Sequence, residues 1–223
     1  MNFQISIRRY DPETDSEPRW DTYTVPSGDR TTVLEALAHV YENLDPTLAY
    51  GSGCRFGACG LCALEVNGQP RMACSAKLKD GMKLAPLAGM PVLRDLVIDR
   101  TAFFEGLRKL RIFIKEEDPS GEPQILRVPK LHARLAACVE CLACNSTCPS
   151  YDFSSDPLAG PYLLVKLAQL RLDPRDTVDR REQAQDLGLS QCIDCRSCYC
   201  IRGLDIRRDV LGVLMGEEGS TEA

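Results

Sequence analysis

The sequence predicts an α+β protein of two domains, a small sheet domain over residues 1–100 and an all-helical domain over residues 101–223. Short strand patterns and one amphipathic helix pattern mark the first hundred residues, whereas later segments show mainly helical spacing. The twelve cysteines fall into three groups, at residues 54–74, 138–148 and 192–200. The first predicted domain therefore carries one group and the second domain carries two.

Composition limits the classes of function that fit this chain. Its 223 residues are 44% hydrophobic, enough for an ordinary core, and the net charge of −5 argues against nucleic acid as a partner. No apolar run approaches the ~18 residues of a membrane span, and the start "MNFQISIRRY" lacks the apolar core of a secretory signal. We therefore expect a cytoplasmic chain, in which grouped cysteines bind metal more often than they form disulfides.

The predicted sheet begins at the N-terminus. Phe3, Ile5 and Ile7 alternate with polar residues, which indicates a half-buried strand. Tyr23 and Val25 indicate a second strand after the polar turn "DPETDSEP".

A helix and a hairpin are predicted next. The segment "TTVLEALAHVYENL" places its apolar residues at helical spacing after Thr31 or Thr32, either of which suits an N-cap. The segment "CALEVNGQPRMAC" predicts a hairpin that turns at Asn67-Gly68. Trp20 is expected in the core. The apolar helix positions are Val33, Leu34, Leu37, Val40, Tyr41 and Leu44.

The first cysteine group has the spacing of a plant-type [2Fe–2S] ferredoxin, Cys54-x4-Cys59-x2-Cys62 with Cys74 further on. A loop that supplies three thiolates bends tightly around inorganic sulfide, and glycines allow this. The alternatives are a glycine-rich turn with free cysteines, and a zinc site, which usually uses two separated C-x2-C pairs. We expect a plant-type ferredoxin-like β-grasp domain. The loop residues whose backbone is expected to approach the cluster are Gly53, Arg55, Gly57 and Gly60.

The second cysteine group reads Cys138-x2-Cys141-x2-Cys144-x3-Cys148 and is followed by proline. Bacterial ferredoxins carry this run, and their fourth cysteine ligates the other of two clusters. A helix with incidental buried cysteines is the structural alternative. The helical domain is therefore predicted to be bacterial-ferredoxin-like and to hold two further clusters.

The third cysteine group crowds four thiols into nine positions. If the two clusters of the helical domain exchange their fourth ligands, this crowding is explained, because the stretch then serves two sites. All twelve cysteines then have a place. The predicted ligand sets are Cys138, Cys141, Cys144 and Cys200 for a [4Fe–4S] cluster, and Cys148, Cys192, Cys195 and Cys198 for a third cluster.

The remaining segments carry weaker signals. Residues 91–114 look helical and apolar on one side, and residues 115–130 read as a polar surface loop. The charged segment 173–186 is expected to be a solvated helix or loop, and the tail 216–223 is expected to fray. His132 is expected to be solvated or to cap a helix.

In combination, several segments resemble the iron–sulfur subunit of succinate dehydrogenase and fumarate reductase, over nearly the whole chain. The resemblance implies an electron carrier that performs no bond chemistry itself. It would work between a flavoprotein subunit that holds FAD and membrane anchor subunits that hold quinone, with or without haem, on the cytoplasmic side of the membrane. The segments are "CRFGACGLCALEVNG", "MKLAPLAGMPVLRDLVIDRTAFF", "LAACVECLACNSTCPSY", "GPYLLVKLAQLRLDPRDT" and "CIRGLDI".

The third group departs from the family pattern. Ser190 and Arg196 stand where the family usually has cysteines that ligate a [3Fe–4S] cluster, and Ile201 replaces the usual proline after Cys200. Because four thiolates are available at the third site, we expect a [4Fe–4S] cluster there in preference to [3Fe–4S].

The resemblance also implies a region that faces quinone, at Pro149, Phe153 and Ile193. Here Phe153 stands near the place of paired tryptophans and Ile193 in place of a histidine. The alternative function is therefore the same three-cluster wire in a quinone-independent flavoprotein complex, heterodisulfide-reductase-like or a thiol-linked fumarate reductase. A zinc-stabilised interaction protein is the non-catalytic alternative.

Overall fold

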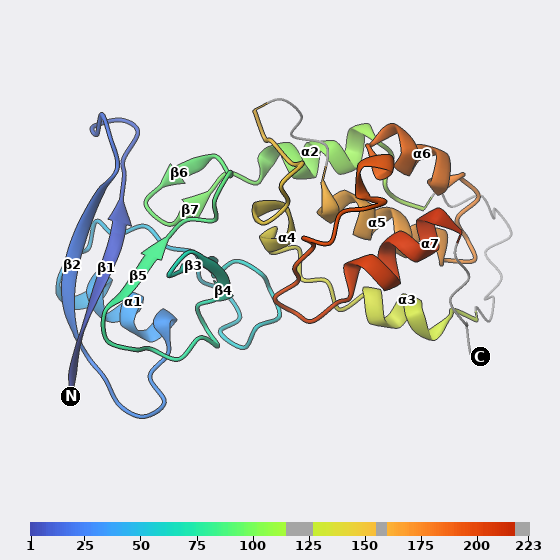
Figure 1. The fold of residues 1–223 in the computed structure, drawn as a ribbon. Helices are drawn as coiled ribbons and strands as arrows, with labels where there is room; N and C mark the ends of the chain where they lie inside the picture. Colours follow the sequence, from blue (N-terminus) through green and yellow to red (C-terminus); the bar gives the residue numbers. More distant parts are fainter. Residues whose placement is uncertain (115–126, 155–159, 217–223) are drawn as a thin grey trace, which may run out of the picture. The chain divides into compact units, whose positions relative to one another are not determined.

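The structure, a computed structural model, contains two compact units (Figure 1). Met1–Asp99 and Val139–Ser146 form the first unit, and Arg100–Cys138 and Thr147–Ala223 form the second. The segment with Cys141 and Cys144 therefore groups with the sheet unit, and a domain boundary at residue 100 stays a prediction. The residues that the structure describes are 1–114, 127–154 and 160–216.

A five-stranded mixed sheet forms the body of the first unit. Its strand order is β2-β1-β5-β3-β4, in which β1 is parallel to β5 and the other neighbours are antiparallel. Ile5, Ile7 and Val25 are fully buried, so the alternation predicted for the first two strands is confirmed. The strands are β1 (Asn2–Arg9), β2 (Arg19–Pro26), β3 (Ala63–Val66), β4 (Gln69–Met72) and β5 (Met82–Ala85).

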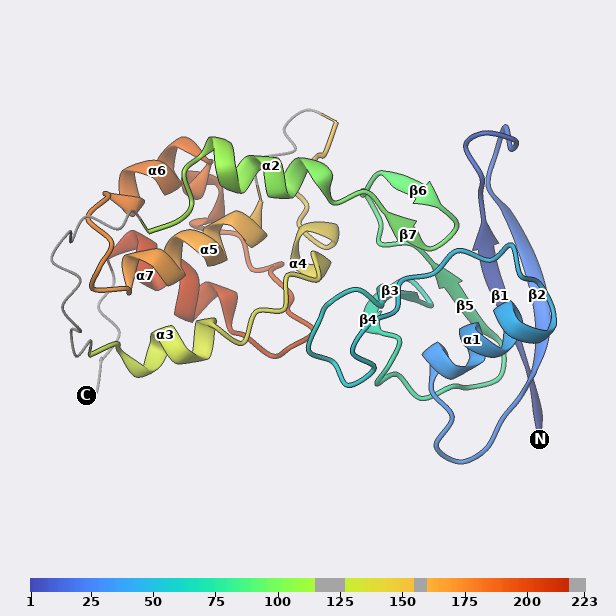
Figure 2. The same ribbon diagram turned by 180° about the vertical axis from the view of Figure 1, so that it is seen from behind.

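Helix α1 (Val33–Asn43) covers one face of this sheet (Figure 2). Its N-cap is Thr32, whose side chain and backbone pair reciprocally with Glu35 in a capping box, which confirms the predicted start. The helix buries a narrower stripe than the sequence predicts. Tyr41, in the last turn, and Leu44, the C-cap, stay 45% and 48% exposed, and the last buried residue of the helix is Val40.

The hairpin β3–β4 turns at Asn67 and Gly68, whose φ angles of 52° and 74° are those of the predicted tight turn. The prediction for Trp20 is wrong, because its side chain is 49% exposed. Trp20 lies on the edge strand β2, and the Lys83 ammonium sits 5.8 Å from its ring centroid.

A small two-stranded sheet, β6 (Val92–Arg94) with β7 (Val97–Ile98), replaces the first part of the helix predicted over residues 91–114. Asp95 takes a left-handed φ of 46° at its turn. The Asp95 carboxylate accepts N–H groups from distant backbone, which the local pattern does not reveal. Helix α2 begins only at Thr101.

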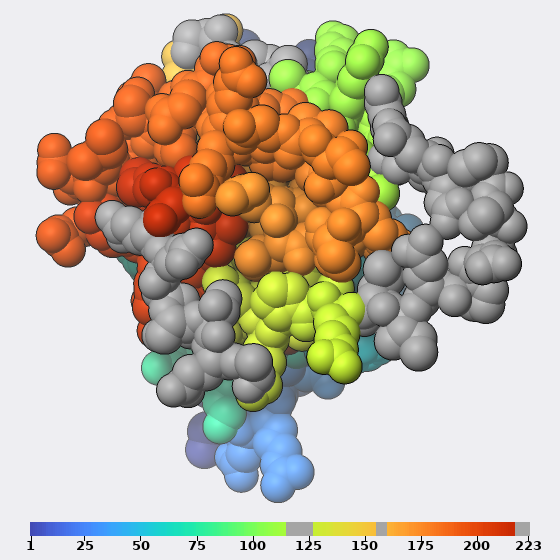
Figure 3. Space-filling view, turned by 90° about the vertical axis from the view of Figure 1, so that its right-hand side faces the viewer, coloured from blue at the N-terminus to red at the C-terminus, as the bar shows by residue number. Residues whose placement is uncertain are grey.

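The second unit is helical, and α5 lies at its centre. Nearly every side chain of α5 up to Ala168 is buried, as expected of a helix with apolar residues all round. Segments around α3, α5–α6 and α7 meet on the face of Figure 3. The helices are α2 (Thr101–Lys109), α3 (Lys130–Leu135), α5 (Pro161–Arg171), α6 (Arg180–Asp186), a 3₁₀ turn (Leu189–Cys192), a π-helical turn (Ile206–Leu211) and α7 (Gly212–Met215); α4 (Ala143–Ser146) belongs to the first unit.

The charged segment predicted to be solvated is partly buried, so that prediction is wrong for its key residues. The side chains of Arg180 and Asp176 are 1% and 3% exposed and form a two-point ion pair, with nitrogen–oxygen distances of 2.6 and 2.9 Å. Arg180 also donates to the carbonyl oxygens of Arg111 and Phe113. The loop predicted at 115–130 falls mostly, and the tail almost wholly, outside the described residues.

Candidate iron–sulfur sites

The first cysteine loop, residues 51–62, brings thiols together through backbone N–H groups. The Ala58 N–H donates to Cys54 Sγ at 3.2 Å, and the Cys54 N–H donates to Cys59 Sγ at 3.4 Å. Desolvation raises the pKa of the Cys54 thiol. Hydrogen bonds from the backbone N–H groups of Phe56 and Ala58 have a larger combined effect in the opposite direction, and the pKa falls to about 7. Cys54 is thus held near the thiolate form that binds iron.

The other two thiols of this group lie beside the first two. Burial, with a further contribution from the neighbouring Cys74 and Cys59, raises the pKa of Cys62 to about 11. Such mutual repulsion requires that the sulfurs be close together. A cationic metal centre would remove this cost, since coordination deprotonates a thiol outright. The four predicted ligands of the first site are therefore neighbours, although no three of them are arranged to hold a single metal ion.

Two glycines leave the space that the loop needs. A Cβ on Gly53 would lie 3.0 Å from both Cys59 Sγ and Leu61 Cδ1, and a Cβ on Gly51 would lie 2.1 Å from the Leu61 carbonyl oxygen. Arg55 and Gly57 take left-handed φ angles of 66° and 81°. This tight glycine-rich loop beside the thiols fits a [2Fe–2S] cluster, whose sulfides accept backbone N–H groups.

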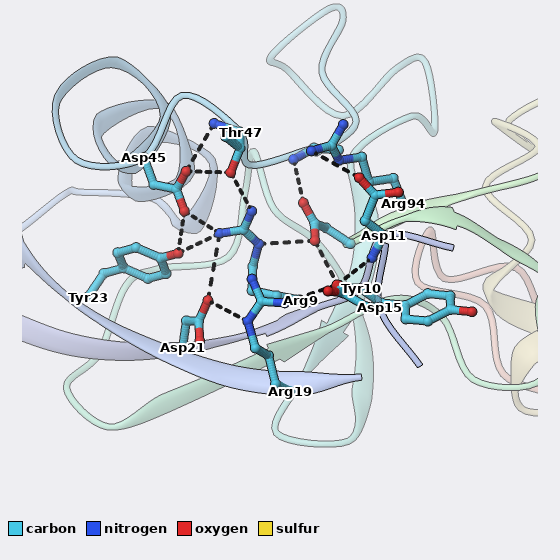
Figure 4. Close-up of polar contacts among 12 residues, drawn as sticks. Arg9, Tyr10, Asp11, Asp15, Arg19, Asp21, Tyr23, Asp45, Thr47 and Arg94 are labelled. Carbon is cyan, nitrogen blue, oxygen red and sulfur yellow. Dashed lines mark hydrogen bonds and ion pairs between the residues drawn. The ribbon is translucent and has the colours of Figure 1, made fainter. Parts of the chain in front are cut away.

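A buried ionic network holds the base of the first cysteine loop (Figure 4). Arg9 Nε donates to Asp95 Oδ1 at 3.0 Å, and its Nη atoms bond Asp45 and Thr47. The second oxygen of Asp95 accepts the Ala49 N–H at 2.8 Å. Because Arg9 and Asp95 are 3% and 2% exposed, the network fixes the segment that enters the loop. The sequence did not reveal it, since the partners lie up to 86 residues apart.

The backbone of the second cysteine group is unusual at Cys141. Glu140 and Leu142, on either side of it, take left-handed φ angles of 56° and 65°, although neither is a glycine. Such conformations cost about 1–3 kcal/mol each and cluster at functional sites. They turn successive N–H groups and the Cys141 side chain out of a regular helix, as a loop wrapped around a cluster requires.

Gly60 of the first loop meets this second group directly. A Cβ on Gly60 would lie 2.2 Å from the Val139 carbonyl oxygen and 3.1 Å from Cys141 Cα. The first cysteine loop and the Cys141 backbone are therefore in contact within the first unit. Gly60 is predicted as a residue of the first cluster loop, and its contact with the second group is not foreseen by the sequence.

In the second unit, Cys148 lies close to the third cysteine group. Burial, with further contributions from the thiols of Cys192, Cys148 and Cys195, raises the pKa of Cys198 to about 11. Cys148 and Cys195 also raise the pKa of Cys192 beyond the effect of burial. The four thiols predicted for the third cluster thus share one neighbourhood, whereas Cys200 Sγ accepts the Arg202 N–H at 3.4 Å.

The residues predicted to face quinone are in different settings. Ile193 is 55% exposed and Pro149 is exposed. The Phe153 ring packs against the buried Phe103, with centroids 5.9 Å apart.

His132, which is expected to be solvated or to cap a helix, has its Nε2 atom 3.9 Å from Asp173 Oδ2.

Two features are absent from the described residues. No group of three or more His, Cys, Asp or Glu side chains there is arranged to hold one metal ion. In the same part of the chain, no helix is long and apolar enough to span a bilayer.

Comparison with known proteins supports the first site. The family described as "2Fe-2S iron-sulfur cluster binding domain" matches residues 4–105, which include the whole first cysteine group. The chain therefore has an α+β fold that includes a [2Fe–2S] cluster binding domain.

Relatives of similar length identify the family. The fumarate reductase iron-sulfur subunit of Haemophilus influenzae is 34% identical over 190 residues, which cover 77% of this chain and 74% of the relative. The succinate dehydrogenase iron-sulfur subunit of Paracoccus denitrificans is 32% identical over 222 residues, 94% of this chain and 86% of the relative. The chain belongs to the family of succinate dehydrogenase and fumarate reductase iron–sulfur subunits.

A solved structure and a longer relative extend this comparison. A chain of the Mycobacterium smegmatis Sdh1 complex in the apo form matches with a TM-score of 0.84 and 27% identity, over 97% of this chain and 95% of that chain. A fumarate reductase (CoM/CoB) subunit of Methanothermobacter marburgensis is 30% identical over 93% of this chain. The chain spans 42% of the length of that relative.

Proposed function

We propose that this chain is the electron-transfer subunit of a succinate:quinone or fumarate-reducing complex. It passes electrons between a flavoprotein subunit that holds FAD and a quinone site at membrane anchor subunits. The family and the gathered thiols support this proposal. When bound, iron–sulfur clusters supply one-electron redox chemistry at potentials set by their surroundings. The chain's own residues hold, orient and tune these carriers and perform no bond chemistry.

The observation that carries the proposal is the contact at Gly60. The loop that holds the first cysteine group touches the backbone around Cys141 with no side chain between them. Two structural zinc sites would not need backbone contact of this kind. Two redox centres that exchange electrons do need a short separation, and the missing Cβ of Gly60 provides it.

The ligand assignment follows the cysteine groups. Cys54, Cys59, Cys62 and Cys74 hold the [2Fe–2S] cluster in a plant-type ferredoxin-like β-grasp domain over residues 1–100. The bacterial-ferredoxin-like helical domain over residues 101–223 holds the other two. The assigned ligands are Cys138, Cys141, Cys144 and Cys200 for a [4Fe–4S] cluster, and Cys148, Cys192, Cys195 and Cys198 for a third cluster of [4Fe–4S] type in preference to [3Fe–4S].

The partners follow from the proposed role. The flavoprotein subunit supplies FAD, and anchor subunits with quinone, with or without haem, hold the chain at the cytoplasmic side of the membrane. The exposed side chains of Pro149 and Ile193 are available to such a partner. Phe153 is turned toward Phe103 and supports the segment that follows Cys148.

Co-purification from gently solubilised membranes of the native host tests this function. The expected result is a complex with a flavoprotein and a multi-helix anchor that couples succinate to a quinone. A complex without an anchor, or with a cysteine-rich catalytic partner, would overturn the quinone assignment. It would favour the quinone-independent alternative with the same carriers.

A further inference from the structure

Arg207 binds the loop that carries two of the proposed ligands of the third cluster. Its guanidinium donates to the carbonyl oxygens of Cys192, Ile193 and Cys195, at 3.3, 2.9 and 2.6 Å. Three carbonyl oxygens within four residues therefore converge on one side chain. A planar fork of N–H donors suits this convergence, and a lysine ammonium does not reproduce it.

The backbone under Arg207 is held firmly and is itself unusual. Arg207 lies in the π-helical turn Ile206–Leu211, a rare conformation that occurs often at functional sites. Asp205 caps the turn by accepting the Arg208 N–H at 3.0 Å, and Ile206 and Val210 are buried beneath it. The guanidinium is thus presented to the cysteine loop from a fixed base.

The charge of Arg207 is not neutralised by a partner. In the described part of the chain no carboxylate forms an ion pair with it, whereas the neighbouring Arg208 pairs with the buried Asp209. The Arg207 guanidinium instead lies against the backbone of the cysteine loop, within 3.3 Å of the carbonyl oxygens of Cys192 and Cys195. Its positive charge therefore lies beside the backbone of two residues that are proposed ligands.

We propose that Arg207 is a positioning residue of the third cluster, which holds the Cys192–Cys195 loop in shape and raises the reduction potential of the cluster. The inference rests on the ligand assignment of the proposed function. Reduction adds a negative charge to a cluster, and a nearby unneutralised cation stabilises the reduced state. Hydrogen bonds and charges around the ligands are known levers on cluster potential.

The test is a redox titration of the loaded protein followed by electron paramagnetic resonance, on wild type and the variants Arg207→Gln, Arg207→Lys and Arg208→Gln. Arg207→Gln is expected to lower the reduction potential of the third cluster by about 59 mV, which corresponds to a roughly tenfold change in the one-electron equilibrium constant. Arg207→Lys keeps the charge and is expected to retain most of the potential with a smaller third-cluster signal, because the fork is lost. Arg208→Gln is the matched control, because the Arg208 side chain is 66% exposed and Arg134 also pairs with Asp209, and it is expected to behave as wild type.

Several outcomes decide the inference. An unchanged potential and signal in Arg207→Gln would overturn it, as would equal effects in the Arg208→Gln control. If Arg207→Gln assembles no third cluster while Arg207→Lys does, the role of the guanidinium in holding the loop is supported. Loss of that cluster in both Arg207 variants and in the control would contradict a specific role. A wild-type protein without a third cluster would instead refute the proposed function on which the inference rests.

Discussion

The contact at Gly60 makes a sharp prediction for Gly60→Ala. An alanine Cβ there would lie 2.2 Å from the Val139 carbonyl oxygen, and real Cβ atoms essentially never come closer than 3.0 Å. The two backbones must therefore separate by about 0.8 Å or more. Because this contact joins the first loop to the Cys141 segment, the substitution is expected to weaken the coupling between the first two redox sites.

The energetic cost has two parts. Gly60 has a φ of +72°, and a left-handed conformation costs an L-residue roughly 1–2 kcal/mol. Relieving the overlap adds roughly 1–3 kcal/mol, the typical cost of overpacking. Gly68→Ala is the matched control, because Gly68 has a φ of +74° and a Cβ there would meet nothing within 4 Å. Only the first part applies to it.

Two assays on the loaded protein check this prediction. Hydrogen exchange in the first unit is expected to show a loss of roughly 2–5 kcal/mol in local stability for Gly60→Ala and roughly 1–2 kcal/mol for Gly68→Ala. Electron paramagnetic resonance of the reduced protein is expected to show weaker magnetic interaction between the first two sites in Gly60→Ala alone. Equal stability losses in the two variants, or an unchanged magnetic interaction in Gly60→Ala, would contradict a tight contact between Gly60 and Val139 that sets the separation of the two sites.

Three further predictions follow from single contacts. Arg180→Met leaves the buried Asp176 carboxylate without its ion-pair partner, and hydrogen exchange is expected to show a loss of roughly 3–5 kcal/mol in the local stability of α6. Adding Asp176→Leu is expected to restore part of this stability, and no recovery would contradict an unpaired buried charge as the cause. Cys198→Ser is expected to change only the third-cluster signal and Cys200→Ser only that of the second, and the opposite pattern would reverse the assignment. Burial and a hydrogen bond to Asp45 raise the pKa of Tyr23 to about 12. The free energy of unfolding that this phenol contributes is therefore present below pH 10 and is expected to fall as pH rises from about 10 to 12. Urea unfolding measures this fall, and an equal fall in Tyr23→Phe would exclude Tyr23 as its cause.

Local signals in the sequence predict much of the sheet unit. The capping box at Thr32 and the turn at Asn67-Gly68 depend on residues a few positions apart, and both are where the sequence places them. Trp20 is misplaced because its exposure depends on the edge position of β2 in the finished sheet. The helix predicted from residue 91 fails because Asp95 obtains its backbone partners from segments far along the chain.

At the candidate sites too, local patterns are predictable from the sequence and contacts between distant segments are not. Cysteine spacing predicts which thiols gather, since a ligand loop is a local pattern. The supporting side chains are not predictable in this way. Arg207 reads as one charge in a basic run, and only its three carbonyl contacts separate it from Arg208. Arg180 reads as solvated because its carbonyl acceptors, on Arg111 and Phe113, are 69 and 67 residues away.

The proposed function requires that this chain carry three separate clusters, with four thiolates at the third. A redox titration of the purified protein, followed by electron paramagnetic resonance and iron and sulfide analysis, tests it most directly. We expect three one-electron centres that titrate separately, and no strong [3Fe–4S] signal in the oxidised protein. A strong oxidised [3Fe–4S] signal would contradict the four-thiolate third site, and fewer than three centres would contradict the wire itself.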